Sequence, residues 1–469
     1  MISSVHLTGI LLTFIIVSAL GVYSVRYVKS SRDFAVGSRS MGPVLVAASV
    51  IASFVGGTSI IGTAQMAFHY GVSGIWFTLG AGISCLIAGL FLARPLREAE
   101  VDTIPQFLQR AYARPVGAWA SLFISLGMYI QIIAQLLAAI PLLRAILPLN
   151  PLQSGAVALA IIIGCVIFGG FWGTSLVGLL KTALLCISLF AAGIAGFGLI
   201  GGWPGLRTAF PPEPWFSMFP HGAAAELAAG FSVVVGFVST QAYLQPIFAS
   251  KDVRAARAGA LLVAVLVPLI GAAGVLVGMF MRVRAPLIDP GQAVPRFVLE
   301  YLPPWLGGVA VATLFISLIM TGASLLLSVS IMFTQDVYRE FFRRRAKDRE
   351  LLIVSRTLIF LLAVVALFFT YTNVNSLILK WAFLSMTLRG VTVFLPLLGA
   401  IFLRDKIHPR AGLLAVSVAP AAALAWAVAF PGGIDPFYIG IALSAAFLTG
   451  GMIFRRKSHA HPKHPDLPW

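Results

Sequence analysis

Long apolar stretches recur along the whole chain, and short polar segments separate them. Each is close to the roughly 20 residues that a helix needs to cross a bilayer. The first carries no charged residues before it and no cleavage pattern, so we interpret it as an anchor rather than a signal peptide. The pattern predicts an all-α polytopic membrane protein with about 13 transmembrane helices, over residues 5–27, 43–69, 73–94, 117–147, 154–171, 176–200, 224–248, 257–281, 306–334, 352–371, 376–402, 411–430 and 436–454.

Composition and charge agree with this class. Hydrophobic residues make up 59% of the chain and charged residues 10%, which excludes a water-soluble fold of 469 residues. The net charge of +17 also suggests a nucleic-acid partner, but the charges follow topology. With the N-terminus outside and the C-terminus in the cytoplasm, most Lys and Arg lie in cytoplasmic loops. The outer loops hold only Arg144, Arg207, Arg282, Arg284 and Arg296. We therefore predict contact with membrane lipid and no nucleic-acid partner.

Chemistry-bearing residues are scarce inside the spans. No Asp or Glu falls in the central part of any span, and all seven His lie in loops, tails or span ends. This argues against an intramembrane enzyme, which needs paired acids or a nucleophile beside a base. The three cysteines lie within spans and show no disulfide or metal spacing. The basic tail after Phe454 is too short to hold a signalling domain, so a sensor remains a remote alternative only if it acts through a partner, and no obligate protein partner is evident.

The segment Val44–Gly71 is unusual for a membrane helix. Small and hydroxyl residues occupy its middle, namely Ser49, Ser53, Gly56, Gly57, Thr58 and Ser59. A Gly pair weakens a helix, and freed backbone groups are tolerated at membrane depth only against protein or a water-filled cavity. We interpret this as a broken helix of the kind that secondary transporters use for binding. The alternative is a close helix–helix contact through small residues.

The order of the spans predicts a symmetric core. Without the first helix and the last two, ten spans remain, in two blocks of five with opposite orientation in the membrane. The predicted organisation is an extra helix and loop (1–42), a first repeat (43–200), an extracellular loop (201–223), a second repeat (224–402), and two C-terminal helices with a tail (403–469).

Three motifs carry a resemblance to a known family. They are Ser31–Pro43 before the small-residue break, Gln245-Pro246 followed by Ser250-Lys251-Asp252, and Thr334–Tyr338. In order and spacing, over residues 30–405, the chain resembles the sodium:solute symporter family, in a bacterial branch of unknown solute. The resemblance implies a LeuT-like five-plus-five inverted-repeat fold in a bacterial inner membrane. It also implies sodium-coupled symport of a small organic solute by alternating access, with a carboxylate or an amino acid as candidates.

The same resemblance implies a sodium site between the first and eighth core helices. Its ligands would be the carbonyls of Ala52 and Val55, the carbonyl of Ser317, and a side-chain pair at Met320 and Thr321. Thr321 supplies a hard oxygen, but the Met320 thioether is a poor ligand for sodium. We therefore predict weak sodium binding that depends on Thr321, and no other metal.

Lys181 offers an alternative cation. Where many family members carry an Asp near this site, the chain has Gly178, and Lys181 follows one turn later. An ammonium in the cation site would make transport proton-coupled or sodium-independent. Lys181 is also only about two turns from the cytoplasmic end, so snorkelling to the membrane surface is the interpretation that the sequence favours.

Candidate solute-binding residues are the polar groups expected near mid-membrane. Gln131 and Gln135 share one helix face, and Arg389 lies halfway along its span, too deep for snorkelling. A buried guanidinium needs a partner, either a solute carboxylate or carbonyls at a helix end. The full candidate set is Gly56, Gly57, Thr58, Ser59, Gln65, Gln131, Gln135, Ser239, Gln241, Tyr243 and Arg389.

Overall fold

The computed structural model describes residues 3–24, 40–99, 101, 103–168, 171–343, 346, 348–403, 406–430 and 432–457. Nearly all of these residues are helical. The first half contains α1 (Ser4–Ser24), α3 (Pro43–Phe54), η3 (Thr58–Gly62), α4 (Thr63–Tyr70), η4 (Gly71–Ile75), α5 (Trp76–Ile87), η5 (Ala88–Leu92), α6 (Ala93–Glu98), α7 (Ile104–Ala111), α8 (Arg114–Ile146), α9 (Pro151–Phe168) and α10 (Phe171–Leu199). The second half contains α11 (Gly202–Ala209), α12 (Pro212–Trp215), α13 (Ala223–Phe237), α14 (Gln241–Phe248), α15 (Val253–Arg284), η6 (Pro290–Gln292), α16 (Ala293–Glu300), α17 (Pro304–Met332), η7 (Phe333–Phe342), α18 (Asp348–Thr372), α19 (Ile378–Phe402), α20 (Pro409–Ala429) and α21 (Pro436–Lys457).

Helices occupy each of the 13 expected ranges, so the all-α multi-pass architecture is confirmed. In the described residues, nine helices are long and apolar enough to span a membrane, or ten if one bent pair counts as a span. Three shorter apolar helices add to these, and residues 58–98 count as one run although they belong to two expected spans. The number 13 therefore stays a prediction. Residues 31–39 of the first motif, and the tail from residue 458, lie outside the described residues.

Gly71 makes the turn between the two expected spans within residues 58–98. It ends α4 with a φ of +68°, a backbone conformation that favours glycine. A Cβ at this position would lie 2.1 Å from the Trp215 carbonyl oxygen. Gly71 therefore lets the chain turn back here without a long loop, and the turn packs against α12.

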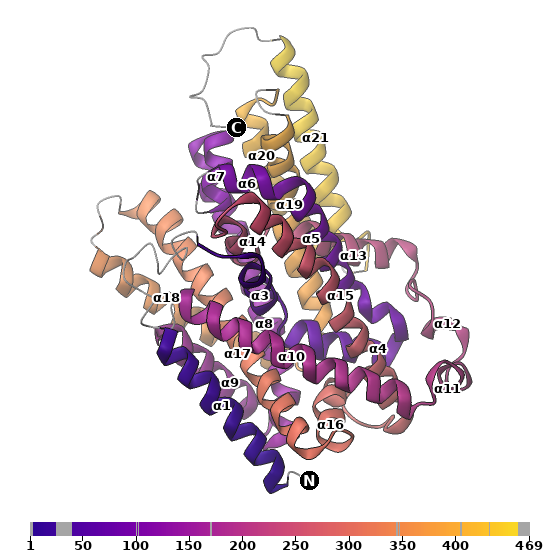
Figure 1. Cartoon of the computed structure of the whole chain (residues 1–469). Coiled ribbons are helices and arrows are strands. Elements are labelled where there is room, and N and C mark those ends of the chain that lie inside the picture. The colour runs from indigo at the N-terminus through magenta and orange to yellow at the C-terminus, as the bar shows by residue number, and fades with distance from the viewer. Residues whose placement is uncertain are drawn as a thin grey trace.

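The helices form a bundle around α8, α17 and α19. α8 packs extensively against both α19 and α17, while α15 covers α3, α4 and α5. Figure 1 shows α1 along one side of the bundle and α20 and α21 running side by side at another. The central helix α8 is largely buried along its length, which is where we expect the functional polar residues.

Both predicted repeats begin with a broken helix. The first break separates α3 from η3, and the second separates α13 from α14, which are bent by 42°. A short backbone pairing joins the two broken helices: Met41 N donates to the Ala249 carbonyl at 3.2 Å, and Lys251 N donates to the Met41 carbonyl at 3.0 Å. The breaks are observed, whereas the division of the chain into repeats stays a prediction.

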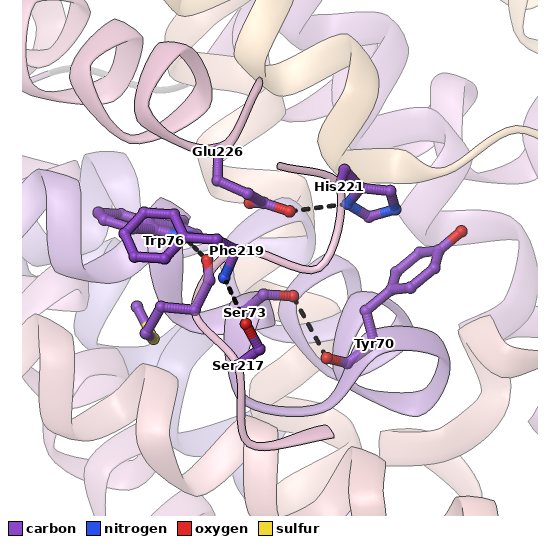
Figure 2. A network of polar contacts seen from close by, with 8 residues as sticks. Tyr70, Ser73, Trp76, Ser217, Phe219, His221 and Glu226 are labelled. Atoms are coloured by element: carbon purple, nitrogen blue, oxygen red, sulfur yellow. Dashed lines mark hydrogen bonds and ion pairs between the residues drawn. The ribbon is translucent and has the colours of Figure 1, made fainter. Parts of the chain in front are cut away.

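A loop after α12 covers the turn between α4 and α5 (Figure 2). Trp76 Nε1 donates to the Met218 carbonyl at 2.8 Å. His221 Nδ1 lies 2.7 Å from the buried carboxylate of Glu226 in the first turn of α13, and its ring packs on Tyr70 with centroids 4.3 Å apart. This network fastens the loop to the turn between α4 and α5 and to the start of α13.

Labelling tests the predicted orientation. In a variant without the three native cysteines, Leu287→Cys is expected to react with a membrane-impermeant maleimide added to intact cells. Leu287 follows Pro286 and is 99% exposed. Ala346→Cys is expected to react only after lysis, because the Lys/Arg bias assigns it to the cytoplasm. The reverse pattern would invert the topology.

Candidate functional site

The Gly56-Gly57 segment is a true helix break. α3 ends at Phe54, Val55 adopts an extended conformation, and helical structure resumes at Thr58. Ser59 Oγ donates to the Gly56 carbonyl at 3.1 Å and accepts from the Gly56 N–H at 3.0 Å. The hydroxyl thus satisfies backbone groups that the break frees, as membrane burial requires.

The break is also a site of close helix packing. A Cβ on Gly57 would lie 2.6 Å from Ala138 Cβ in α8 and 3.0 Å from Leu318 Cδ1 in α17. A Cβ on Gly56 would lie 2.8 Å from Thr321 Oγ1. The same glycines therefore interrupt the helix and let two neighbours approach it, while a role of the break in binding stays a prediction.

Lys181 occupies the centre of the expected cation site. Its Nζ donates to the Ala52 carbonyl at 2.7 Å, to the Ser317 carbonyl at 3.3 Å and to Thr321 Oγ1 at 3.4 Å. Thr321 Oγ1 in turn donates to the Ala52 carbonyl at 3.2 Å. The three oxygens come from α3 and α17, and the side chain reaches them from α10.

The predicted snorkelling of Lys181 is wrong. The side chain is 1% exposed, and its ammonium finds three oxygens for its three N–H donors. Charge-assisted hydrogen bonds contribute about 1.5–3 kcal/mol each, which offsets the several kcal/mol that burying an ammonium costs. Of the other expected ligands, Met320 is only partly buried, and Val55 is buried directly after the end of α3, where its N–H donates to the Ile51 carbonyl.

Gly178 explains how the lysine reaches this position. A Cβ there would lie 2.8 Å from Ala52 Cβ, so α10 and α3 approach closely at that point. An Asp at residue 178 would not fit without a shift of one helix. The close approach brings Lys181, one turn later, beside the Ala52 carbonyl. Thr182 Oγ1 adds a second link, to the Ala48 carbonyl at 3.3 Å.

A polar network joins four of the solute-binding candidates. Thr58 Oγ1, at the start of η3, accepts from Gln135 Nε2 at 2.6 Å and from Gln131 Nε2 at 3.1 Å. Gln131 Oε1 accepts from an Arg389 guanidinium nitrogen at 3.4 Å. Gln135 Oε1 is buried without a partner. The structure thus brings Thr58, Gln131, Gln135 and Arg389 together beside the break.

Arg389 is fully buried at the meeting point of α8, α13, α14 and α19. Its guanidinium donates to Thr240 Oγ1 at 2.7 Å, and to the Ser385 carbonyl and hydroxyl at 3.1 and 2.8 Å. It also lies over the Tyr243 ring, 5.7 Å from the centroid. All these partners are neutral.

Three other candidates lie elsewhere. Gln65 Oε1 accepts from Ile378 N at 2.9 Å and lines a cavity of about 60 Å³ that also borders the Arg144–Asp289 ion pair. Gln241 Oε1 accepts from Ile104 N at 2.9 Å. Ser239 Oγ donates to a carbonyl of its own helix at 2.7 Å. Gln65 and Gln241 thus each accept from a backbone N–H at a helix start, while Ser239 and Gln241 flank Thr240, which holds Arg389.

Sequence reasoning missed Ser385 and Gly127. Ser385 Oγ donates to the Gly127 carbonyl in α8, and a Cβ on Gly127 would lie 2.6 Å from Arg389 Cγ. The signal was present, because Ser385 precedes Arg389 by one helical turn on the same face. Gly127 makes room for the Arg389 stem from another helix, and no pattern in the sequence links these two residues.

Comparison with known proteins places the chain in a family. A sequence model of the sodium:solute symporter family matches residues 34–408. The osmoregulated proline transporter OpuE of Bacillus subtilis is 25% identical over 386 residues, 78% of this chain and 77% of that protein. The human sodium/myo-inositol cotransporter 2 is 27% identical over 76% of this chain, and the chain spans only 60% of the cotransporter's length.

Solved structures agree in fold. The chain matches a Na⁺-coupled sialic acid symporter with a TM-score of 0.77 and 18% identity, over 98% of this chain and 99% of the other. It matches the nucleobase-cation symporter Mhp1 with a TM-score of 0.59 and 13% identity, over 90% and 94% of the two chains. The fold is therefore the expected LeuT-like one. With most of its length matched by the family model, the chain belongs to the sodium:solute symporter family of membrane transporters, and not to a family of enzymes.

Proposed function

We propose that this transporter carries a small organic solute across a bacterial inner membrane by alternating access, with the Lys181 ammonium as the resident cation between α3 and α17. The family is sodium-coupled, and its members are named for solutes as different as proline, myo-inositol and choline. The observation that carries the proposal is the 2.7 Å hydrogen bond from Lys181 Nζ to the Ala52 carbonyl, among the oxygens expected to hold sodium. Ammonium and sodium cannot occupy that space together.

Sodium coupling through the same oxygens is the second candidate. The carbonyls of Ala52 and Ser317 and the hydroxyl of Thr321 converge on one point, and they are the hard ligands that sodium prefers. Sodium would bind there only in a conformation in which Lys181 leaves. The two candidates differ in one measurable respect, namely whether the parent protein responds to sodium.

Thermal unfolding of the purified protein tests this without knowing the solute. We expect equal melting temperatures in sodium chloride and potassium chloride at the same ionic strength, because Lys181 fills the site. Choline is avoided as the control cation, because some relatives are choline transporters. A sodium-specific rise in melting temperature that Thr321→Ala removes would contradict the proposal. A rise that Thr321→Ala keeps would mean that sodium binds elsewhere.

A further inference from the structure

We propose that the solute of this transporter carries a carboxylate, and that the Arg389 guanidinium binds it. The inference rests on the proposed transport function and adds the chemical class of the solute. It starts from a cation that the fold buries completely and surrounds with neutral groups. No ion pair of the described residues includes Arg389. Such a charge at membrane depth is costly unless an anion joins it.

Residues of α8, of α19 and of the second helix break together fix the position of Arg389. α8 carries a glycine where the arginine stem passes, and a Cβ on Gly127 would lie 2.6 Å from Arg389 Cγ. Ser385 fixes the guanidinium through its carbonyl at 3.1 Å and its hydroxyl at 2.8 Å. Thr240, in the break between α13 and α14, holds another nitrogen at 2.7 Å. The guanidinium is thus held at the second helix break and linked through Gln131 to the first.

Its donors outnumber its strong acceptors. A guanidinium has five N–H groups. Nε donates to the Ser385 carbonyl and Nη1 to Thr240 Oγ1, and Tyr243 is a further side-chain partner of the guanidinium. Nη2 has two N–H groups: one donates to the Ser385 hydroxyl at 2.8 Å, and the other meets only Gln131 Oε1 at 3.4 Å and the weakly accepting Met386 sulfur at 3.3 Å. A carboxylate oxygen would replace these two weak contacts with one charge-assisted hydrogen bond, which is shorter and about twice as strong.

Gln135 supplies an independent sign of a ligand. Its Oε1 is fully buried, has no hydrogen-bond partner and would lie 3.2 Å from a Cβ on Gly57, at the break itself. A buried acceptor left unpaired is costly unless a donor arrives. The network therefore offers one anion-binding group and one acceptor, Gln131 and Thr58 connecting the two. This fits a small carboxylate that also carries a hydroxyl or an N–H group.

Thermal unfolding with matched probes tests the inference. The purified full-length protein is titrated with the potassium salts of acetate, L-lactate and pyruvate, with L-proline, and with the neutral partners acetamide, L-lactamide and L-prolinamide (tested above its amine pKa). We expect at least one carboxylate to raise the melting temperature in a saturable way, and its amide partner to have no effect. Arg389→Gln is expected to lower the affinity for that carboxylate by about 10- to 100-fold. Lys380→Gln, which removes an exposed charge from the same helix, is expected to bind as the parent does.

Two results would overturn the inference: no response to any of the carboxylates, or a response that Arg389→Gln retains in full. If Arg389→Gln does not fold, Arg389→Lys keeps the charge without the planar fork, and Gln135→Leu removes the free acceptor. Both are expected to fold and to bind the carboxylate more weakly than the parent. Lys181→Met separates this inference from the cation proposal, since it leaves Arg389 intact. Carboxylate binding that survives in Lys181→Met, whatever its sodium response, supports the solute class on its own.

Discussion

Replacing Lys181 by Met is expected to abolish uptake and to turn the site between α3 and α17 into one that binds sodium. The substitution keeps the length of the side chain but removes the ammonium from the Ala52 and Ser317 carbonyls and Thr321 Oγ1. Three buried oxygens are then left without their cation, and a hard cation can satisfy them. If Lys181 is the resident cation of the cycle, as proposed, transport fails because that charge is gone, while the fold gains a dependence on an external ion.

The melting temperature of Lys181→Met in sodium chloride and in potassium chloride measures this change. If sodium reaches 100 times its dissociation constant, it adds about 2.7 kcal/mol to the free energy of unfolding. The double variant Lys181→Met/Thr321→Ala is expected to lose that sodium response. Lys406→Met, at an exposed lysine, serves as the control for loss of a positive charge. Unchanged uptake by Lys181→Met would refute a role for the lysine in transport.

The sequence predicted the break at Gly56-Gly57 because its causes are local. A Gly pair with hydroxyl neighbours destabilises a membrane helix at that point. The Ser59 hydroxyl then hydrogen-bonds the N–H and the carbonyl of Gly56, three residues earlier in the chain. The number of spans is less certain from sequence, because Gly71 reverses the chain within one helical run and the polar loop that normally separates two spans is missing.

The cation site shows where sequence reasoning stops. The positions of Ala52, Ser317 and Thr321 followed from the family motifs, and the structure brings their oxygens to one point. The sequence did not identify Lys181 as the group that occupies the site, because a lysine two turns from a membrane surface can point toward the surface or into the bundle. The close approach of α10 to α3 at Gly178 decides the direction, and that contact joins residues about 130 positions apart in the chain.

The polar solute-binding candidates divide for a similar reason. Gln131 and Gln135 were paired correctly, because residues four apart share a helix face. Gln65 and Gln241 carry the same side chain but accept from the backbone N–H groups of Ile378 and Ile104 at helix starts. No sequence pattern separates a glutamine that holds a helix end from one that joins the network at Thr58, because the difference lies in long-range packing.

Gly57→Leu is expected to abolish uptake while the protein still inserts into the membrane. The new side chain would meet Ala138 Cβ and Leu318 Cδ1, and even a Cβ would lie 2.6 Å from the alanine. α8 or α17 must then move away from the break, which separates Gln135 from Thr58. Overpacking typically costs about 1–3 kcal/mol, against a free energy of unfolding of about 5–15 kcal/mol for a typical protein. The loss therefore falls on binding rather than on folding.

A graded series distinguishes displaced helices from general instability. Gly57→Ala is expected to reduce carboxylate binding and uptake, and Ala138→Gly in the same chain to restore both, because it removes the methyl group that the new Cβ meets. Gly450→Leu, where a Cβ meets nothing within 4 Å, is expected to behave as the parent. Uptake rates are compared at equal amounts of membrane-inserted protein. Normal uptake by Gly57→Leu would mean that the solute passes elsewhere, since no ordinary rearrangement keeps α8, α17 and a leucine in the space of this glycine.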